Sequence, residues 1–311
     1  ASYHNALAIS PGLTETHNNL GVALKNLGKP EEAVSSYHKA LAIKPDWAEV
    51  HSNLGVALQD LRKLDEAVAS YSKALAIEPD SAVAHFNLGQ ALMEQGTLDD
   101  AVANYDKAIS IKPDYAEAYW NKSLALLLCG EFEKGWELHE WRHEGGSIPS
   151  RQQKFKYLRL EGAELKKQAD SKKFKLDTQK LLVWMEQGAG DEIMFASLLP
   201  DLAQHIGTIV VECDKRLQPI FQRSFPEINF VTRMDPPSSK LSENNIDYQS
   251  SVADLGYFLR PDVNSFPVQN SYLCPELNKQ NQIRNEYVRK WPGKLLVGIS
   301  WRSGNVKNGK S

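Results

Sequence analysis

The feature that most restricts the fold of this chain is a short pattern that returns at a constant interval. The tripeptide Asn-Leu-Gly begins at residues 19, 53 and 87, so each copy follows the last by 34 residues. Four further positions keep this interval and one residue type each: Ala33, Ala67 and Ala101; Tyr37, Tyr71 and Tyr105; Ala40, Ala74 and Ala108; Pro45, Pro79 and Pro113. A period of this length indicates supersecondary units that bury their apolar faces by stacking on one another.

Within each unit the apolar residues have helical spacing, as in Leu20, Ala23, Leu24 and Leu27. A glycine follows each Asn-Leu pair, and we expect these small residues to lie where the two helices of a unit cross. Glycines at 28 and 96 predict the turn between the helices, and the repeated proline predicts the end of the second helix.

This period and residue set resemble the tetratricopeptide repeat, a helix–turn–helix unit. The resemblance implies an all-α solenoid over residues 1–143. It has a partial repeat at 1–13, full repeats at 14–47, 48–81 and 82–115, and a degenerate repeat at 116–143. Residues 144–179, rich in lysine and glutamine, are predicted to be a linker with one short helix.

One polar position on the first helix also repeats, at Asn19, Asn53, Asn87 and Asn121. An asparagine amide both donates and accepts, so it can pair with a peptide backbone. The row resembles the asparagine ladder of the O-linked N-acetylglucosamine transferase superhelix, which implies a protein or peptide partner along the concave face. The alternative, left open, is that these amides bond neighbouring turns and stabilise the stack.

Three histidines repeat at the same interval, at residues 17, 51 and 85. We interpret them as packing residues, because at least one repeat separates them and a metal ion needs its ligands about 2 Å away. No metal site is predicted.

After the linker the periodicity changes to short apolar runs that alternate with helical segments. Strands are predicted at 181–185, 208–212, 228–231, 246–249 and 294–299, and helices at 193–202, 215–223, 255–258 and 276–291. This alternation predicts a parallel α/β sheet of Rossmann-like type. The full Gly-x-Gly-x-x-Gly fingerprint is absent because residue 193 is isoleucine, which disfavours a dinucleotide dehydrogenase.

Two motifs resemble the heptosyltransferase-like GT-B glycosyltransferases: the run 186–193, Glu-Gln-Gly-Ala-Gly-Asp-Glu-Ile, with Leu-Pro-Asp-Leu at 199–202, and Val-Gly-Ile-Ser-Trp-Arg-Ser-Gly at 297–304. The Gly-Trp and Glu-Trp-Arg junction at 135–142 is similar to that of bacterial proteins in which such a domain follows the repeats. The resemblance implies an N-terminal GT-B lobe at 180–293. Residues 294–311 would only begin the second lobe, so we expect that lobe to be truncated.

The GT-B resemblance also implies roles for individual residues. Asp191 is the implied catalytic base, and contacts to the phosphates of a nucleotide-sugar donor are implied for Gln187, Gly188, Gly190, Ser300, Arg302 and Lys307. No cofactor is expected beyond that donor. The alternative for Asp191 is a helix N-cap, a position that favours aspartate on physical grounds alone.

Composition limits the kinds of partner and the compartment that we expect for this chain. A net charge of −3 gives no reason to expect nucleic acid as a partner, and no run approaches the ~18 apolar residues of a membrane span. Cys129, Cys213 and Cys274 show no metal spacing, so a reducing cytoplasm is expected.

Two functions stay open at this point. One is a glycosyltransferase whose solenoid recruits a protein acceptor, or, less favoured, one that acts on a glycan or lipid-linked sugar. As a fragment it is expected to be inactive, because the sugar nucleotide would need the missing lobe. The alternative is a non-enzymatic scaffold that binds protein partners. The sequence specifies neither the sugar nor the acceptor.

Overall fold

The chain folds into two compact units, Ala1–Ser147 and Ile148–Ser311. The computed structural model describes residues 2–10, 12–144, 155–162, 178–186, 188–238, 241, 245–268 and 271–292. None of the helices in these ranges is long and apolar enough to cross a membrane.

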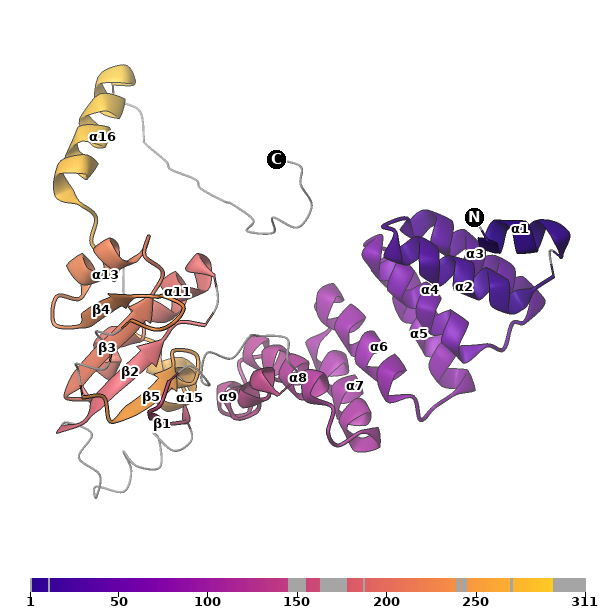
Figure 1. The fold of residues 1–311 in the computed structure, drawn as a ribbon, viewed down its shortest axis with the longest axis horizontal. Helices are drawn as coiled ribbons and strands as arrows, with labels where there is room; N and C mark the ends of the chain where they lie inside the picture. The colour runs from indigo at the N-terminus through magenta and orange to yellow at the C-terminus, as the bar shows by residue number, and fades with distance from the viewer. Residues whose placement is uncertain are drawn as a thin grey trace. The chain divides into compact units, whose positions relative to one another are not determined.

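The first unit is built of helices that pack in consecutive pairs (Figure 1). They are α1 (Ser2–Ile9), α2 (Thr14–Asn26), α3 (Pro30–Ile43), α4 (Ala48–Asp60), α5 (Leu64–Ile77), α6 (Ala82–Gln95), α7 (Leu98–Ile111), α8 (Ala116–Leu128) and α9 (Phe132–His139), followed by the 3-10 turn η1 (Glu140–His143). The even-numbered helix of each repeat is its first helix, and the next odd-numbered one is its second.

The close crossing predicted for the repeated glycines is confirmed. A Cβ added at Gly55 would lie 2.6 Å from the ring of Tyr71, and Gly21 and Gly89 meet their tyrosines in the same way. The tyrosine rings and the repeated alanines are fully buried. Burial raises the pKa of Tyr37 to about 12, because the apolar core disfavours the phenolate.

The turns between paired helices require a left-handed backbone. Gly28, Gly96 and Gly130 have φ values of 74°, 85° and 83°, which glycine adopts at no steric cost. In the second repeat the same position is Arg62, with φ of 60°. Arg62 also pairs with Glu94 at 2.5 Å, through a side chain that is 73% exposed.

We therefore expect Arg62→Gly to be more stable than Arg62→Ala by about 1 kcal/mol, because only alanine keeps a Cβ in the left-handed region. Both variants lose the exposed ion pair, so its small contribution cancels. Urea unfolding followed by helical circular dichroism measures the difference. Equal stability of the two variants would show that this backbone is not strained.

The second unit contains a five-stranded parallel sheet with the order β1-β5-β2-β3-β4 (Figure 1). The strands are β1 (Leu158–Arg159), β2 (Lys180–Trp184), β3 (Thr208–Cys213), β4 (Asn229–Thr232) and β5 (Tyr248–Ser251). The helices are α11 (Ala189–Ala196), α12 (Leu199–Leu202), α13 (Gln218–Ser224), α15 (Leu255–Leu259) and α16 (Leu277–Lys290), with a 3-10 turn η4 (Val263–Ser265).

The prediction of a linker over 144–179 needs a correction, because this stretch supplies β1. Leu158 and Arg159 pair with Tyr248 and Gln249 at the edge of the sheet. A two-residue strand whose leucine is 68% exposed leaves no apolar run in the sequence, so periodicity could not show it.

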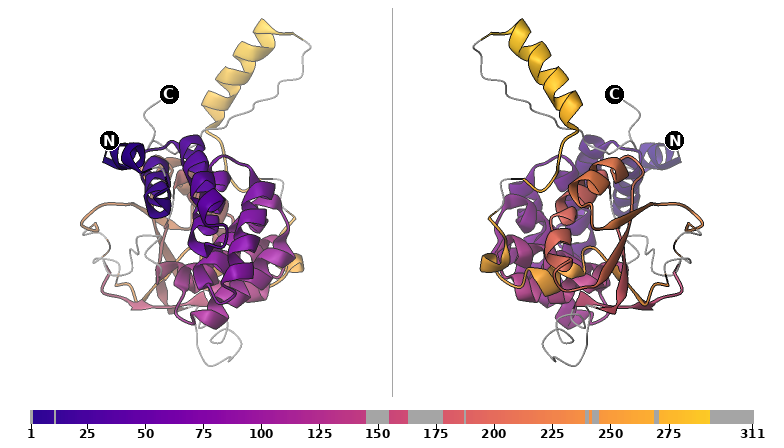
Figure 2. Two further views of the ribbon diagram at one scale, coloured as in Figure 1. Left: turned by 90° about the vertical axis from the view of Figure 1, so that its right-hand side faces the viewer. Right: turned by 90° about the vertical axis from the view of Figure 1, so that its left-hand side faces the viewer.

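The central strands are buried on both faces, as parallel strands generally are. Leu181, Val183 and Met185 face one core, which α11, α12, α13 and α15 complete. Leu182 and Trp184 face a smaller core on the other side. By contrast, all residues of α16 are exposed, and the helix stands clear of the sheet in Figures 1 and 2.

Candidate functional site

The repeated asparagines of the first helices do not all have the same surroundings. Asn53 donates to Oδ1 of Asn18 in the preceding repeat at 3.2 Å, and Asn121 donates to the Glu117 carbonyl of its own helix at 2.8 Å. Asn19 is exposed and Asn87 half-buried. Within the described residues, no hydrogen bond engages the side chain of either one. The row therefore contains both engaged and available amides.

A pocket of about 350 Å³ lies beside this row, between the first helices α4 and α6. Asn53, Ser52 and Glu49 of α4 line it, with Ser81 and Val83 at the start of the next repeat. Its lining offers amide, hydroxyl and carboxylate groups, which suit the donors and acceptors of a peptide backbone.

Two larger grooves lie between the second helices of successive repeats. Groove A, of about 710 Å³, lies between α1 and α3 and has α2 as its floor. Groove B, of about 680 Å³, lies between α3 and α5 and has α4 as its floor. The residues that recur in the linings of both grooves at the 34-residue interval are Leu7/Leu41, His17/His51, Leu20/Leu54, Leu24/Leu58, Glu32/Glu66, Ser36/Ser70, Lys39/Lys73, Ala42/Ala76 and Ile43/Ile77. None of the repeated asparagines lines either groove.

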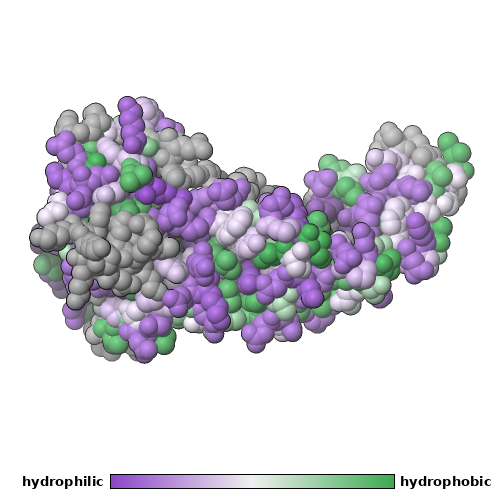
Figure 3. All heavy atoms as spheres, turned by 90° about the horizontal axis from the view of Figure 1, so that it is seen from below, coloured by the Kyte–Doolittle hydropathy of each residue, from purple (hydrophilic) through white to green (hydrophobic). Residues whose placement is uncertain are grey.

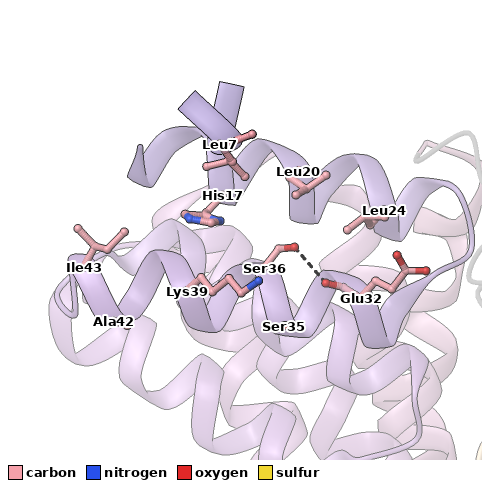
Figure 4. Close-up of a pocket in the computed structure, with 11 residues that line it drawn as sticks. Leu7, His17, Leu20, Leu24, Glu32, Ser35, Ser36, Lys39, Ala42 and Ile43 are labelled. Atoms are coloured by element: carbon pink, nitrogen blue, oxygen red, sulfur yellow. Dashed lines mark hydrogen bonds between the residues drawn. The ribbon is translucent and has the colours of Figure 1, made fainter. Parts of the chain in front are cut away.

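Figure 4 shows His17, Leu20 and Leu24 along α2, the floor of groove A, with Lys39 on the α3 wall beside His17. Ser36 donates to the Glu32 carbonyl of its own helix at 3.0 Å. On the face of the repeats that Figure 3 shows, apolar side chains occur in small groups among polar ones. The grooves are thus local combinations of an apolar floor with charged walls.

The repeated histidines are packing residues in the second and third repeats. His51 Nε2 lies 2.8 Å from the Pro45 carbonyl, and His85 Nε2 lies 3.1 Å from the Pro79 carbonyl. Each imidazole thereby ties the first helix of a repeat to the end of the preceding second helix. This geometry supports the packing interpretation given above.

In the sheet unit, Asp191 lies in the first turn of α11, directly after the carboxyl end of β2. Its carboxylate accepts from the Gly188 N–H at 3.2 Å, so it stabilises the start of the helix. Gly188 and Gly190 are exposed beside it. Both interpretations of Asp191 stay open, because a base could also occupy this place.

The order of the strands makes the carboxyl ends of β2 and β5 the switch point of the sheet, where open α/β sheets place ligands. The β5 end contributes Asp254, whose side chain is buried and accepts from Arg159 at 3.0 Å. Four of the residues assigned to donor binding, Gln187, Ser300, Arg302 and Lys307, lie outside the described residues, as does the strand predicted at 294–299.

A buried ion pair that the sequence did not reveal stands at the same edge. Glu192 is 1% exposed, pairs with Arg233 beyond β4, and accepts from the Asp214 N–H at 2.9 Å. Burial raises the pKa of Glu192, although Arg233 opposes this effect. Its neighbour Cys213 has its pKa raised to about 12, chiefly by burial. The Arg216 side chain lowers the pKa of Asp214 to about 2.

Comparison with known proteins agrees with the helical architecture. Residues 14–46 match the model for the tetratricopeptide repeat, and residues 60–96 and 89–130 match the model for the TPR repeat. The helical unit is a stack of tetratricopeptide repeats. Neither model extends beyond residue 130, so the resemblance of the second unit to glycosyltransferases stays a prediction.

A curated relative, Protein FlbA of Caulobacter vibrioides, is 26% identical over 189 residues. The match covers 57% of this chain and 30% of FlbA, so the chain spans less than a third of that relative. The TPR unit makes up 147 of the 311 residues, which is less than the 57% of the chain that the match covers. The match therefore extends into the second unit.

Solved structures similar to this chain include the crystal structure of MamA, at 27% identity and a TM-score of 0.44, over 49% of this chain and 88% of that one. Pseudomonas aeruginosa PilF is 19% identical with a TM-score of 0.43, over 54% and 71%. The first TPR of Spaghetti (RPAP3), bound to the HSP90 peptide SRMEEVD, is 21% identical with a TM-score of 0.37, over 37% and 92%.

Sequence reasoning overlooked the groove lysines of the TPR unit, although their signal was present. Lys39, Lys73 and Lys107 keep the 34-residue interval. The Glu192–Arg233 pair left no such signal, because its members lie 41 residues apart and meet only through strand order.

Proposed function

We propose that this chain is a protein-interaction scaffold whose TPR unit binds an extended polypeptide along its first helices. The observation that carries the proposal is the row of asparagines at one helical position, in which Asn19 and Asn87 keep amides that no described residue engages. Each such amide can donate to a backbone carbonyl and accept from a backbone N–H. The pocket beside Asn53 provides room for the segment between two repeats.

Recognition of this kind depends on the backbone and not on particular side chains. Packed helices lie about 8–10 Å apart, and an extended segment advances about 3.3 Å per residue. One asparagine per repeat would thus engage about every third residue of the partner. We propose only the class of the partner, which is a protein or peptide segment that can adopt an extended conformation.

We expect Asn87→Ala to weaken peptide binding by about 0.5–1.5 kcal/mol for each hydrogen bond lost, with no change in melting temperature. Asn53→Ala should weaken binding and also lower the melting temperature, because it removes the bond to Asn18. Fluorescence polarisation with a labelled pool of random-sequence peptides measures the affinity. Ser72→Ala on a second helix serves as the control. Unchanged binding by Asn87→Ala would refute a role for the row in binding.

The three cysteines are free thiols, which a reducing compartment would maintain. This supports a cytoplasmic location as part of the proposal.

Glycosyl transfer is a second candidate function, favoured by the position of Asp191 at the switch point of a parallel sheet. There a carboxylate would take the proton of an acceptor hydroxyl as the glycosidic bond forms, with a nucleotide sugar as donor. The test is transfer of labelled sugar by the complete protein and by its Asp191→Asn variant. Transfer that Asp191→Asn abolishes without lowering the melting temperature supports this function, and equal transfer by both proteins excludes Asp191 as the base.

A further inference from the structure

The grooves between second helices form a surface separate from the asparagine row. Each has the volume of a ligand pocket, within the usual ~300–1,000 Å³. Each combines a floor of two buried leucines with an exposed isoleucine at its rim, Ile43 at 47% and Ile77 at 40%. An aliphatic side chain placed on such a floor would remove apolar surface from water.

The charges of the two grooves are not balanced internally. Glu32 is paired with Lys29 at 2.7 Å, and Glu66 with Lys63 at 3.4 Å. Lys39 and Lys73 have no ion pair within the part of the chain that the structure describes. The charge left available by the lysines is therefore positive, and it attracts carboxylates.

Groove B differs from groove A in one charge. Asp46 lines groove B, whereas its counterpart 34 residues earlier is Gly12. Asp46 repels a carboxylate that approaches Lys73. Asp46 has no ion pair among the described residues, so it offsets the charge of Lys73, and of the two grooves only groove A keeps a net positive charge.

In the third repeat a side chain of the second helix reaches the histidine of the first helix. Asn104 stands where the first two repeats have Ser36 and Ser70, and its Oδ1 lies 3.0 Å from Nδ1 of His85. The shorter Ser70 instead donates to the Glu66 carbonyl of its own helix at 2.8 Å. Nδ1 of His51 has no hydrogen-bond partner. Groove B therefore lacks the hydrogen bond between side chains that joins the second helix to the first in the third repeat.

We infer that grooves A and B bind an extended segment of a partner polypeptide that carries acidic and aliphatic side chains. The aliphatic side chains lie on the leucine floors, and the carboxylates pair with Lys39 and Lys73. The segment lies in the grooves between the second helices, so it can bind while another polypeptide lies along the asparagine row. This inference does not depend on the asparagine row.

The test uses the full chain and short fluorescein-labelled peptides of alternating glutamate and leucine, with glutamine and lysine versions as controls. The glutamate peptide should bind, more weakly at high salt because the pairs are exposed, and the two controls should bind at least about fivefold more weakly. Lys39→Met should reduce affinity about fivefold, and Lys73→Met should reduce it less, because Asp46 already weakens groove B.

Lys107→Met is the matched control, since it makes the same change at the same register in the repeat where Asn104 contacts His85, outside grooves A and B. Ser70→Asn should close groove B onto His51 and reduce affinity without lowering the melting temperature. Equal affinity for glutamate and glutamine peptides, or equal losses for Lys39→Met and Lys107→Met, would overturn the inference. Concentration-dependent dimers of the chain that Lys39→Met dissociates would also overturn it, because a second copy would then be the occupant.

Discussion

Replacing Arg233 with methionine is expected to destabilise the sheet unit by about 3–5 kcal/mol, because it leaves the buried Glu192 carboxylate without its partner. The Asp214 N–H remains as a donor to Glu192, but one neutral hydrogen bond does not replace a guanidinium. Hydrogen exchange of the β2 and β3 amides, read by mass spectrometry, measures the loss in this unit alone.

The loss should depend on pH in a defined direction. Burial raises the pKa of Glu192 above its unfolded value, so the folded protein holds this proton more tightly than the unfolded chain. Its contribution therefore favours folding at low pH and is lost as pH rises through the folded pKa. Arg233 opposes that loss by stabilising the carboxylate, so its removal should cost more near pH 7 than near pH 5.

Two further variants test whether the uncompensated buried charge causes the loss of stability. Glu192→Gln combined with Arg233→Met should recover most of the lost stability, because no uncompensated charge then remains. Arg216→Met removes an arginine from the neighbouring Asp214, but this arginine is 69% exposed, so the cost should stay below about 1 kcal/mol. Equal costs for Arg216→Met and Arg233→Met would contradict the role assigned to burial.

Gly55→Ala is expected to destabilise the TPR unit by about 1–3 kcal/mol. The added Cβ would lie 2.6 Å from a ring carbon of Tyr71, and Tyr71 cannot move away easily because it is fully buried and donates to Gln59 at 3.2 Å. The gain in helix propensity from glycine to alanine, about 1 kcal/mol, is included in this net cost. Urea unfolding followed by helical circular dichroism gives the value.

A double-mutant cycle tests whether the tyrosine ring is the cause. In a Tyr71→Leu background the ring is gone, so Gly55→Ala should cost little or even stabilise the helix. If the cost of Gly55→Ala were the same in both backgrounds, the ring contact would not be its source.

The strands could be predicted from sequence wherever they are apolar. Predicted strands at 181–185, 208–212 and 228–231 agree with β2, β3 and β4 within about one residue at each end. The strand predicted at 246–249 begins two residues later, as Tyr248–Ser251. Its residues Gln249, Ser250 and Ser251 are buried polar groups, and the buried Gln249 amide donates to the Tyr157 carbonyl of the neighbouring segment.

The helix predicted across 193–202 divides into α11 and α12. Pro200 lies in the first turn of α12, where its missing N–H costs nothing, whereas inside one continuous helix it would break a hydrogen bond. Ala196 of α11 and Leu199 and Leu202 of α12 pack into the same core. Periodicity alone therefore suggested one helix where two helices share a buried face.

The sequence by itself determined the repeats, because each glycine–tyrosine contact joins residues only 16 positions apart at a fixed interval. Such local contacts leave a regular trace along the chain. Tertiary structure alone decided which side chains are available: Asn53 bonds to Asn18 whereas Asn87 bonds to nothing described, and Lys39 is unpaired whereas Glu32 is paired. It also decided that β5 lies beside β2 and that Arg233 meets Glu192. These choices depend on residues far apart in the chain, and no period in the sequence links them.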